Sequence, residues 1–187
     1  PEQIIGQILN AESLNGNVVA GERALDGILR AFDNSGYLKG ESLIAGDSIH
    51  FDDGSLNWQY IDSLSAERGL HGLVEILEVK TTTPVGGTIL ANASGQTSSR
   101  LDGSMLVNFY VAGSHLKFER YRVKHSYNIP LSGGQSLIQI LQDEKRKQEY
   151  FRALGFELGY KAGRLIYPNW VWVNRTYYNK GTKVLKR

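Results

Sequence analysis

The chain has 187 residues, of which 41% are hydrophobic and 21% charged, and its formal net charge is +2. It contains no cysteine, which excludes disulfides, thiolate metal sites and cysteine nucleophiles. No apolar run approaches the ~18 residues of a membrane-spanning helix, and the N-terminus lacks a signal-peptide pattern, so we expect a cytoplasmic protein without a membrane partner.

Charge is unevenly distributed along the chain. Residues 1–114 carry 6 Lys/Arg and 14 Asp/Glu, whereas residues 115–187 carry 15 Lys/Arg and 5 Asp/Glu. This asymmetry favours either a surface that binds a polyanion or identical subunits that stack acidic face on basic face. A mixed surface, formed by interleaving of the two halves, remains a third possibility.

The N-terminal part, residues 1–36, is predicted to be helical. Ile4, Ile5, Ile8 and Leu9 recur with the spacing of one face of an amphipathic helix, and a second helix is expected from about Gly21 to Phe32. The following region, residues 44–126, is predicted to be rich in β-structure. Its candidate strands are Ser48–Phe51, Asn57–Ile61, Gly72–Thr82, Ser104–Ala112 and Leu116–Ser126, with turns at 52–55 and 111–114.

Residues 83–103 read as a long loop of Gly, Ser, Thr, Asn and Pro, which we expect a ligand, a nucleic acid or a neighbouring subunit to hold in place. A long helix is predicted over 134–155, with Gly155 as its left-handed cap. An aromatic strand and a basic tail complete the chain over 165–187. These elements predict a single α+β domain with a mixed or antiparallel central sheet, flanked by N-terminal helices and one long helix near the C-terminus.

The segment Glu78-Val79-Lys80 is the most specific chemical motif. On a strand, Glu78 and Lys80 project from the same face. A carboxylate can hold a divalent cation beside an ammonium that contacts a phosphate, provided that a second carboxylate arrives from a neighbouring strand. Asp62 is the best candidate for that second ligand. The alternative is an ordinary solvated strand face with a cross-strand ion pair.

Together, Tyr60-Ile61-Asp62 and Leu77-Glu78-Val79-Lys80 resemble the core motif of the PD-(D/E)xK nuclease superfamily. The resemblance implies that Asp62 and Glu78 are ligands of Mg²⁺ or Mn²⁺, that Lys80 is the catalytic lysine, and that Glu22 and Gln96 are accessory residues. The nucleic acid would then lie on the basic second half of the chain. The candidate contacts are Lys117, Arg120, Arg122, Lys124, Lys145, Arg146 and Lys147.

Two functions follow from these observations. The first is a metal-dependent endonuclease that hydrolyses DNA or RNA, of the restriction or toxin type. The second is a non-enzymatic structural subunit of a virion or phage tail, which uses its extended loop and its charge asymmetry for contacts with other subunits. Both interpretations favour a homo-oligomer.

Overall fold

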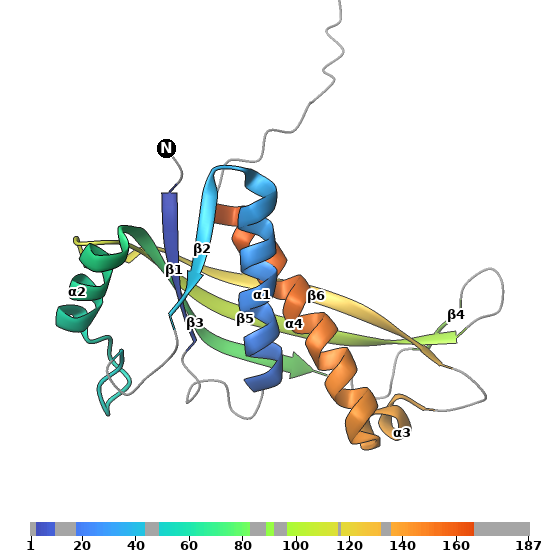
Figure 1. Ribbon diagram of the computed structural model, residues 1–187. Helices are drawn as coiled ribbons and strands as arrows, with labels where there is room; N and C mark the ends of the chain where they lie inside the picture. Colours follow the sequence, from blue (N-terminus) through green and yellow to red (C-terminus); the bar gives the residue numbers. More distant parts are fainter. Residues whose placement is uncertain are drawn as a thin grey trace, which may run out of the picture.

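The computed structural model describes residues 3–9, 18–43, 49–82, 89–91, 97–115, 117–131 and 136–166. A six-stranded mixed sheet forms its centre, with helices on both faces (Figure 1). The elements are, in chain order, β1 (Gln3–Leu9), α1 (Val18–Ser35), β2 (Leu38–Ser42), α2 (Trp58–Arg68), β3 (Leu70–Thr82), β4 (Ile89–Ala91), β5 (Thr97–Val111), β6 (Lys117–Leu131), α3 (Leu137–Gln142) and α4 (Glu144–Ile166). The predicted α+β class with a long helix near the C-terminus is therefore confirmed.

The sheet changes from parallel to antiparallel pairing at β3. β1 pairs in parallel with β2 on one side and with β3 on the other. β3, β4 and β6 all pair antiparallel with β5. Because β6 runs along one edge of β5 for almost its whole length, β3 and β4 share the opposite edge. β6 is thus the outermost strand of a long hairpin.

α1 and α4 lie side by side on one face of the sheet (Figure 1). Their buried side chains form the main core together with residues of all the long strands. Strand alternation places Ile5 and Leu9 of β1 in this core, whereas Ile8 points to the other face. We call these two sides of the sheet the helix-pair face and the open face.

Small residues allow α1 and α4 to approach closely. A Cβ atom added at Gly155 would lie 2.1 Å from the carbonyl oxygen of Ala20, and one added at Gly159 would lie 1.9 Å from that of Ala24. On α1, a Cβ at Gly27 would meet the carbonyl oxygen of Phe156 at 2.1 Å. No side chain fits at these positions, so the two helix backbones pack directly against each other.

On the open face, the described elements that cover the sheet are α2 and residues 49–57, which lie at one end of it (Figure 1). A second core of Ile8, Leu43, Ile49, Ile61, Leu64, Leu70 and Leu73 lies beneath them. The Asn57 side chain caps the N-terminus of α2 by accepting a hydrogen bond from the backbone of Tyr60, and Gly69 ends the helix in the left-handed conformation.

Several predicted elements are wrong. Residues 3–9 form the strand β1 rather than a helix, because both faces of that strand are buried and its apolar residues therefore do not alternate. The predicted strand Asn57–Ile61 is the start of α2. Gly155 lies in the middle of α4, which extends to Ile166.

The predicted long loop 83–103 is largely structured where it is described: residues 89–91 are β4, and residues 97–103 are the first half of β5. The rest of that loop, including Gln96, and the tail 167–187 lie outside the described residues. Both predicted turns are confirmed, with Gly54 and Gly113 at positive φ. The single-domain organisation stays a prediction.

Candidate functional site

Of the three residues predicted to form a metal site, Glu78 and Lys80 contact each other, whereas the polar contact of Asp62 is with a different residue. Asp62 lies on α2 rather than on a strand, and its carboxylate contacts Nε2 of His115 at 2.6 Å. Glu78 contacts Lys80 and Arg122 instead. Within the described ranges, no group of three His, Asp or Glu side chains is arranged to hold a metal ion. The expected hairpin between Asp62 and Glu78 does not form, because residues 58–68 are helical.

What the structure does bring together is a band of charged and polar side chains on the open face. Strand alternation and register set these side chains in lateral rows across β3, β5 and β6. Successive rows hold Glu75, Asn108 and Arg120; Glu78, Leu106 and Arg122; Lys80, Ser104 and Lys124; and Thr82, Asp102 and Ser126; Arg100 and Asn128 follow on β5 and β6. Every even-numbered residue of β6 from Arg120 to Pro130 is exposed.

Glu78 is the centre of a three-residue ion cluster in this band. Nζ of Lys80 donates to Oε2 of Glu78 at 2.6 Å, and Nη1 of Arg122 reaches across β5 to Oε1 at 2.9 Å. The pKa of the Glu78 carboxyl is lowered, mainly by the hydrogen bond from Lys80 and secondly by the hydrogen bond from Arg122. Glu78 is therefore an anion that organises two cations.

Asp102 has a similar role farther along the hairpin. Its carboxylate accepts hydrogen bonds from the hydroxyl of Ser126 at 2.6 Å and from Nε of Arg100 at 2.5 Å. The Ser126 hydrogen bond is the largest cause of a lowered pKa of Asp102. The band therefore contains five cationic side chains, Lys80, Arg100, Arg120, Arg122 and Lys124, against three carboxylates, of which Glu78 and Asp102 lie towards the surface and Glu75 is buried. Its outer surface has an excess of positive charge.

A buried carboxylate lies at the inner end of the band. Glu75 is 2% exposed. Its Oε2 accepts a 2.7 Å hydrogen bond from the hydroxyl of Tyr110, and its Oε1 lies 3.3 Å from Nε2 of His50. The pKa of Tyr110 is raised, mainly because its hydroxyl is buried and secondly because the hydroxyl is hydrogen-bonded to Glu75. Tyr110 therefore stays a hydrogen-bond donor, which makes the buried charge tolerable.

His115 and Asp62 form a polar pair beside the buried carboxylate and Tyr110. Trp58 contacts the ring of Tyr110 edge-on and stacks on His115, with centroid separations of 5.1 and 4.8 Å. His115 has a φ of 53°, which is uncommon for a residue other than glycine. The stack on Trp58 and the contact with Asp62 hold His115 in this conformation.

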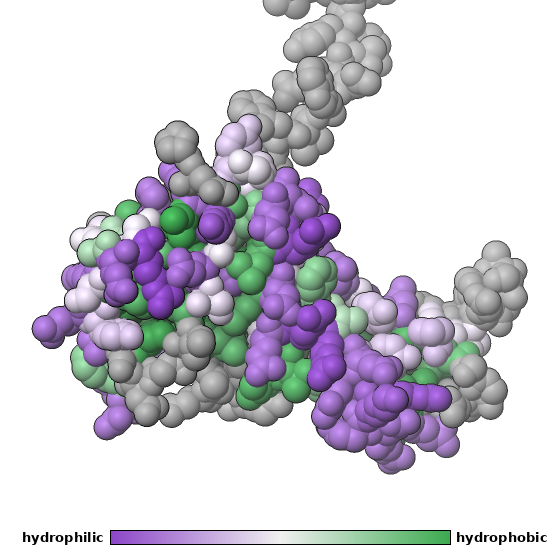
Figure 2. Space-filling model, in the orientation of Figure 1, coloured by the Kyte–Doolittle hydropathy of each residue, from purple (hydrophilic) through white to green (hydrophobic). Residues whose placement is uncertain are grey.

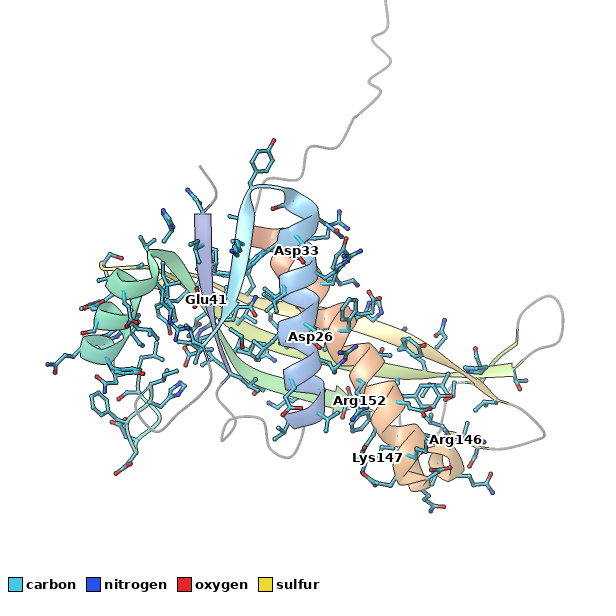
Figure 3. All side chains as sticks on the ribbon, viewed as in Figure 1. Asp26, Asp33, Glu41, Arg146, Lys147 and Arg152 are labelled. Atoms are coloured by element: carbon cyan, nitrogen blue, oxygen red, sulfur yellow. The ribbon has the colours of Figure 1, made fainter. Side chains whose placement is uncertain are left out.

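The predicted nucleic-acid contacts divide between two sides of the molecule. Arg120, Arg122 and Lys124 lie on the open face. Lys145, Arg146 and Lys147 lie on the first turns of α4, which packs against the helix-pair face, and Figures 2 and 3 show this hydrophilic end of α4 near α3. Arg146 and Lys147 pair with Asp143 and Glu144. The side chain of Lys117 lies outside the described residues.

Sequence comparison gives no family: the chain matches no family model and none of the curated proteins. Solved structures are similar in fold. A minor lipoprotein from Acinetobacter baumannii is 11% identical over 88% of this chain and 91% of its own, with a TM-score of 0.44. Rare lipoprotein B from Shewanella oneidensis is 6% identical over 88% and 96%, with a TM-score of 0.39. A PelC dodecamer from Paraburkholderia phytofirmans is 6% identical over 85% and 86%, with a TM-score of 0.38.

These comparisons, with the geometry of Asp62 and Glu78, correct the functional expectations. Several of the similar structures are lipoproteins and not nucleases, so both the superfamily resemblance and the nuclease function are wrong. The phage or virion subunit is not supported either. The expected cytoplasmic location is not borne out either, since several of the similar structures are named lipoproteins. The predicted DNA or RNA partner has no support.

None of the described helices combines the length and the apolar character that crossing a bilayer requires. A homo-oligomer stays a prediction; the dodecamer is a property of the PelC protein. Mg²⁺ or Mn²⁺ was expected only for a nuclease, so we propose no metal.

Protonation of His125 is expected to make stability depend on pH. His125 lies on β6, on the helix-pair face. Its pKa is lowered from the ordinary 6.5, mainly by burial and secondly by the positive charge of Lys161 on α4. The negative charge of Glu157 acts in the opposite direction. A lowered pKa means that the unfolded chain takes up the proton first. The contribution of His125 to the free energy of unfolding is therefore fully present above pH 6.5. This contribution is lost as the pH falls towards the pKa of His125 in the folded state.

Urea unfolding between about pH 7.5 and about pH 5.5 should measure this loss. His125→Gln should flatten the profile across that interval. Lys161→Gln, which removes only the second cause, should flatten it partly. An unchanged slope in His125→Gln would show that another group is responsible.

Proposed function

We propose that this chain is a non-catalytic binding domain that attaches to an anionic membrane surface through the charged band on its open face. The observation that carries the proposal is the presence of five cationic side chains, from three adjacent strands, on one exposed sheet surface. Anionic lipids attract each Lys or Arg near the surface with about 1 kcal/mol. With a net excess of two cations, the band would contribute about 2 kcal/mol, or roughly a 30-fold preference over a neutral surface.

The character of the band favours a lipid surface over a protein partner. Interfaces between proteins are centred on buried aromatic or aliphatic anchors. Between its cations the band offers Ser104, Ser126 and Asn128, and Leu106 is the one aliphatic side chain in the rows named above. Along β6, Arg120, Arg122 and Lys124 recur every two residues, which is about 7 Å on an antiparallel strand. A regular, polar and cationic surface of this kind fits a layer of anionic headgroups.

Vesicle co-sedimentation tests the proposal. The protein should bind phosphatidylcholine vesicles that contain about 30% phosphatidylglycerol, and it should not bind pure phosphatidylcholine. The double variant Arg122→Gln, Lys124→Gln removes two charges and should weaken binding about 30-fold, which corresponds to about 2 kcal/mol. Binding should also weaken steeply with rising salt.

The control is the double variant Lys145→Gln, Arg152→Gln, which removes the same charge from exposed positions of α4 (Arg152 is labelled in Figure 3). This variant should bind almost as well as the unmodified protein. If it lost as much affinity as the variant of the open face, the membrane would lie against the helices and the proposal would be wrong.

A further inference from the structure

The five cations of the band differ in how they are held. Lys80 and Arg122 are paired with Glu78, and Arg100 is paired with Asp102. Arg120 is hydrogen-bonded to a neutral group instead, because its Nε donates to Oδ1 of Asn108 at 2.8 Å. Among the described residues, no carboxylate lies within ion-pair distance of Arg120. Within the part of the chain that the structure describes, its charge is therefore held by a neutral group and is not compensated by direct contact.

The network behind Arg120 sets the orientation of the Asn108 amide. Nδ2 of Asn108 donates to the hydroxyl of Tyr110 at 2.8 Å and lies 3.4 Å from Oε2 of Glu75. The buried negative charge attracts the NH₂ end of the amide and so turns the carbonyl end outward, towards Arg120. Asn108 is 3% exposed, so this arrangement is built into the sheet rather than left to solvent. A chain of hydrogen bonds thus runs from Glu75 to the guanidinium of Arg120.

This arrangement leaves a pre-oriented donor group at the surface. A guanidinium carries five N–H donors, and Asn108 takes the one on Nε of Arg120. The other four donors remain on an exposed side chain whose orientation is already fixed. Little conformational entropy is then lost when an oxyanion binds, and a guanidinium matches the oxygens of a phosphate better than an ammonium does.

We infer that Arg120 is the residue of the band that hydrogen-bonds a lipid headgroup phosphate, and that Asn108 is its positioning residue. Arg100 and Arg122 are also held by hydrogen bonds, but each is paired with a carboxylate, whereas Arg120 is held by a neutral amide. This inference rests on the proposed function, since it assigns a specific role within the same surface. The inference and the proposed function make different predictions for an arginine-to-lysine substitution, because attraction by charge alone does not distinguish arginine from lysine.

Charge-conserving variants test the inference. On phosphatidylglycerol vesicles, Arg120→Lys should weaken binding about 5- to 10-fold although the net charge is unchanged. The matched control Arg122→Lys, one row away on the same strand, should change binding less than about 2-fold, because the charge of Arg122 is already paired with Glu78 and a lysine can form the same ion pair. Equal effects of the two variants would overturn the inference. Failure of the unmodified protein to bind these vesicles would instead overturn the proposed function.

Asn108→Leu tests the positioning role. If Asn108 acts through Arg120, then Asn108→Leu should weaken binding to the same extent as Arg120→Lys, and the double variant should be no weaker than either single variant. Additive losses would show that Asn108 has a separate, structural effect. Circular dichroism confirms that each variant is folded. Should Asn108→Leu fail to fold, the comparison of Arg120→Lys with Arg122→Lys still decides.

The Nε–Hε resonance of Arg120 in NMR spectra reports the contact directly and identifies its source. Titration with soluble dihexanoyl phosphatidylglycerol should shift this resonance and leave that of Arg30 on α1 unchanged. Inorganic phosphate at the same ionic strength should shift it far less and should not release the protein from vesicles. If inorganic phosphate reproduced the shift and released the protein, the ligand would be a free oxyanion, and the assignment to a lipid headgroup would be wrong.

Discussion

Replacing Gly159 by alanine is expected to destabilise the protein by about 3 kcal/mol or more, as measured by urea unfolding. In a solvent-exposed helix the same substitution would stabilise by about 1 kcal/mol, because alanine favours the helical conformation. Here the new methyl group would lie 1.9 Å from the carbonyl oxygen of Ala24, which is backbone and cannot move aside. The helices must separate, and the core beneath them must loosen.

Gly103→Ala is the control for this substitution. Its methyl group would also be crowded, but by side-chain atoms of Leu154, Cδ2 at 2.7 Å and Cγ at 2.9 Å, rather than by backbone. We expect a smaller loss at this position, about 1 kcal/mol, because a side chain can shift more easily than a helix backbone. A Gly159→Ala variant as stable as the unmodified protein would mean that α1 and α4 are farther apart in solution than this packing requires.

Replacing Gln7 by leucine is expected to stabilise the protein by about 1–3 kcal/mol. Gln7 is fully buried on β1, and neither its amide nitrogen nor its amide oxygen has a hydrogen-bond partner among the described residues. A Cβ added at Gly40 of β2 would lie 3.0 Å from the Gln7 amide, so the side chain is tightly enclosed. Leucine fits a similar space and removes two polar atoms that burial has separated from water.

The thermal midpoint measures this gain, with Gln3→Leu as the control on the same strand. Gln3 is exposed at the beginning of β1, so its replacement should leave the midpoint nearly unchanged. A lower midpoint for Gln7→Leu would show that the amide of Gln7 has hydrogen bonds in solution that the apolar side chain cannot replace.

The sequence predicts the β-hairpin and α1 well because their signals are local. The strands at 72–82, 104–112 and 116–126 correspond to parts of β3, β5 and β6, and Gly21–Phe32 lies inside α1. β1 was predicted wrongly because a strand buried on both faces shows no alternation, and Ile4, Ile5, Ile8 and Leu9 happen to match a helical spacing. For α2, a cap signal was present at Asn57 and was overridden by the aromatic residues that follow it.

The site was predicted only in part, because it depends on strand register. The sequence indicates that Arg120, Arg122 and Lys124 share a face, since that follows from alternation within one strand. It does not indicate that Glu78 reaches Arg122 across β5 or that Asn108 lies opposite Arg120, because both contacts require the pairing of distant segments. The sequence does not indicate that Glu75 is buried, because a glutamate in an alternating strand pattern normally lies on the solvent-exposed face. One overlooked signal was available: glycines at 155, 159 and 163 repeat every four residues, as in closely packed helix pairs.

The position of β6 has a consequence for solubility. Its outer side pairs with no other described strand, and a 15-residue strand with free backbone donors and acceptors can recruit a second molecule and start aggregation. An antiparallel match of two molecules centred on Arg122 would place Arg122 opposite its own copy and Arg120 opposite Lys124, and like charges in that position repel. Pro130 withholds a further backbone donor near the end of the strand. The same arginines and lysine that we propose to bind a negative surface are therefore also expected to keep molecules of this protein apart in solution.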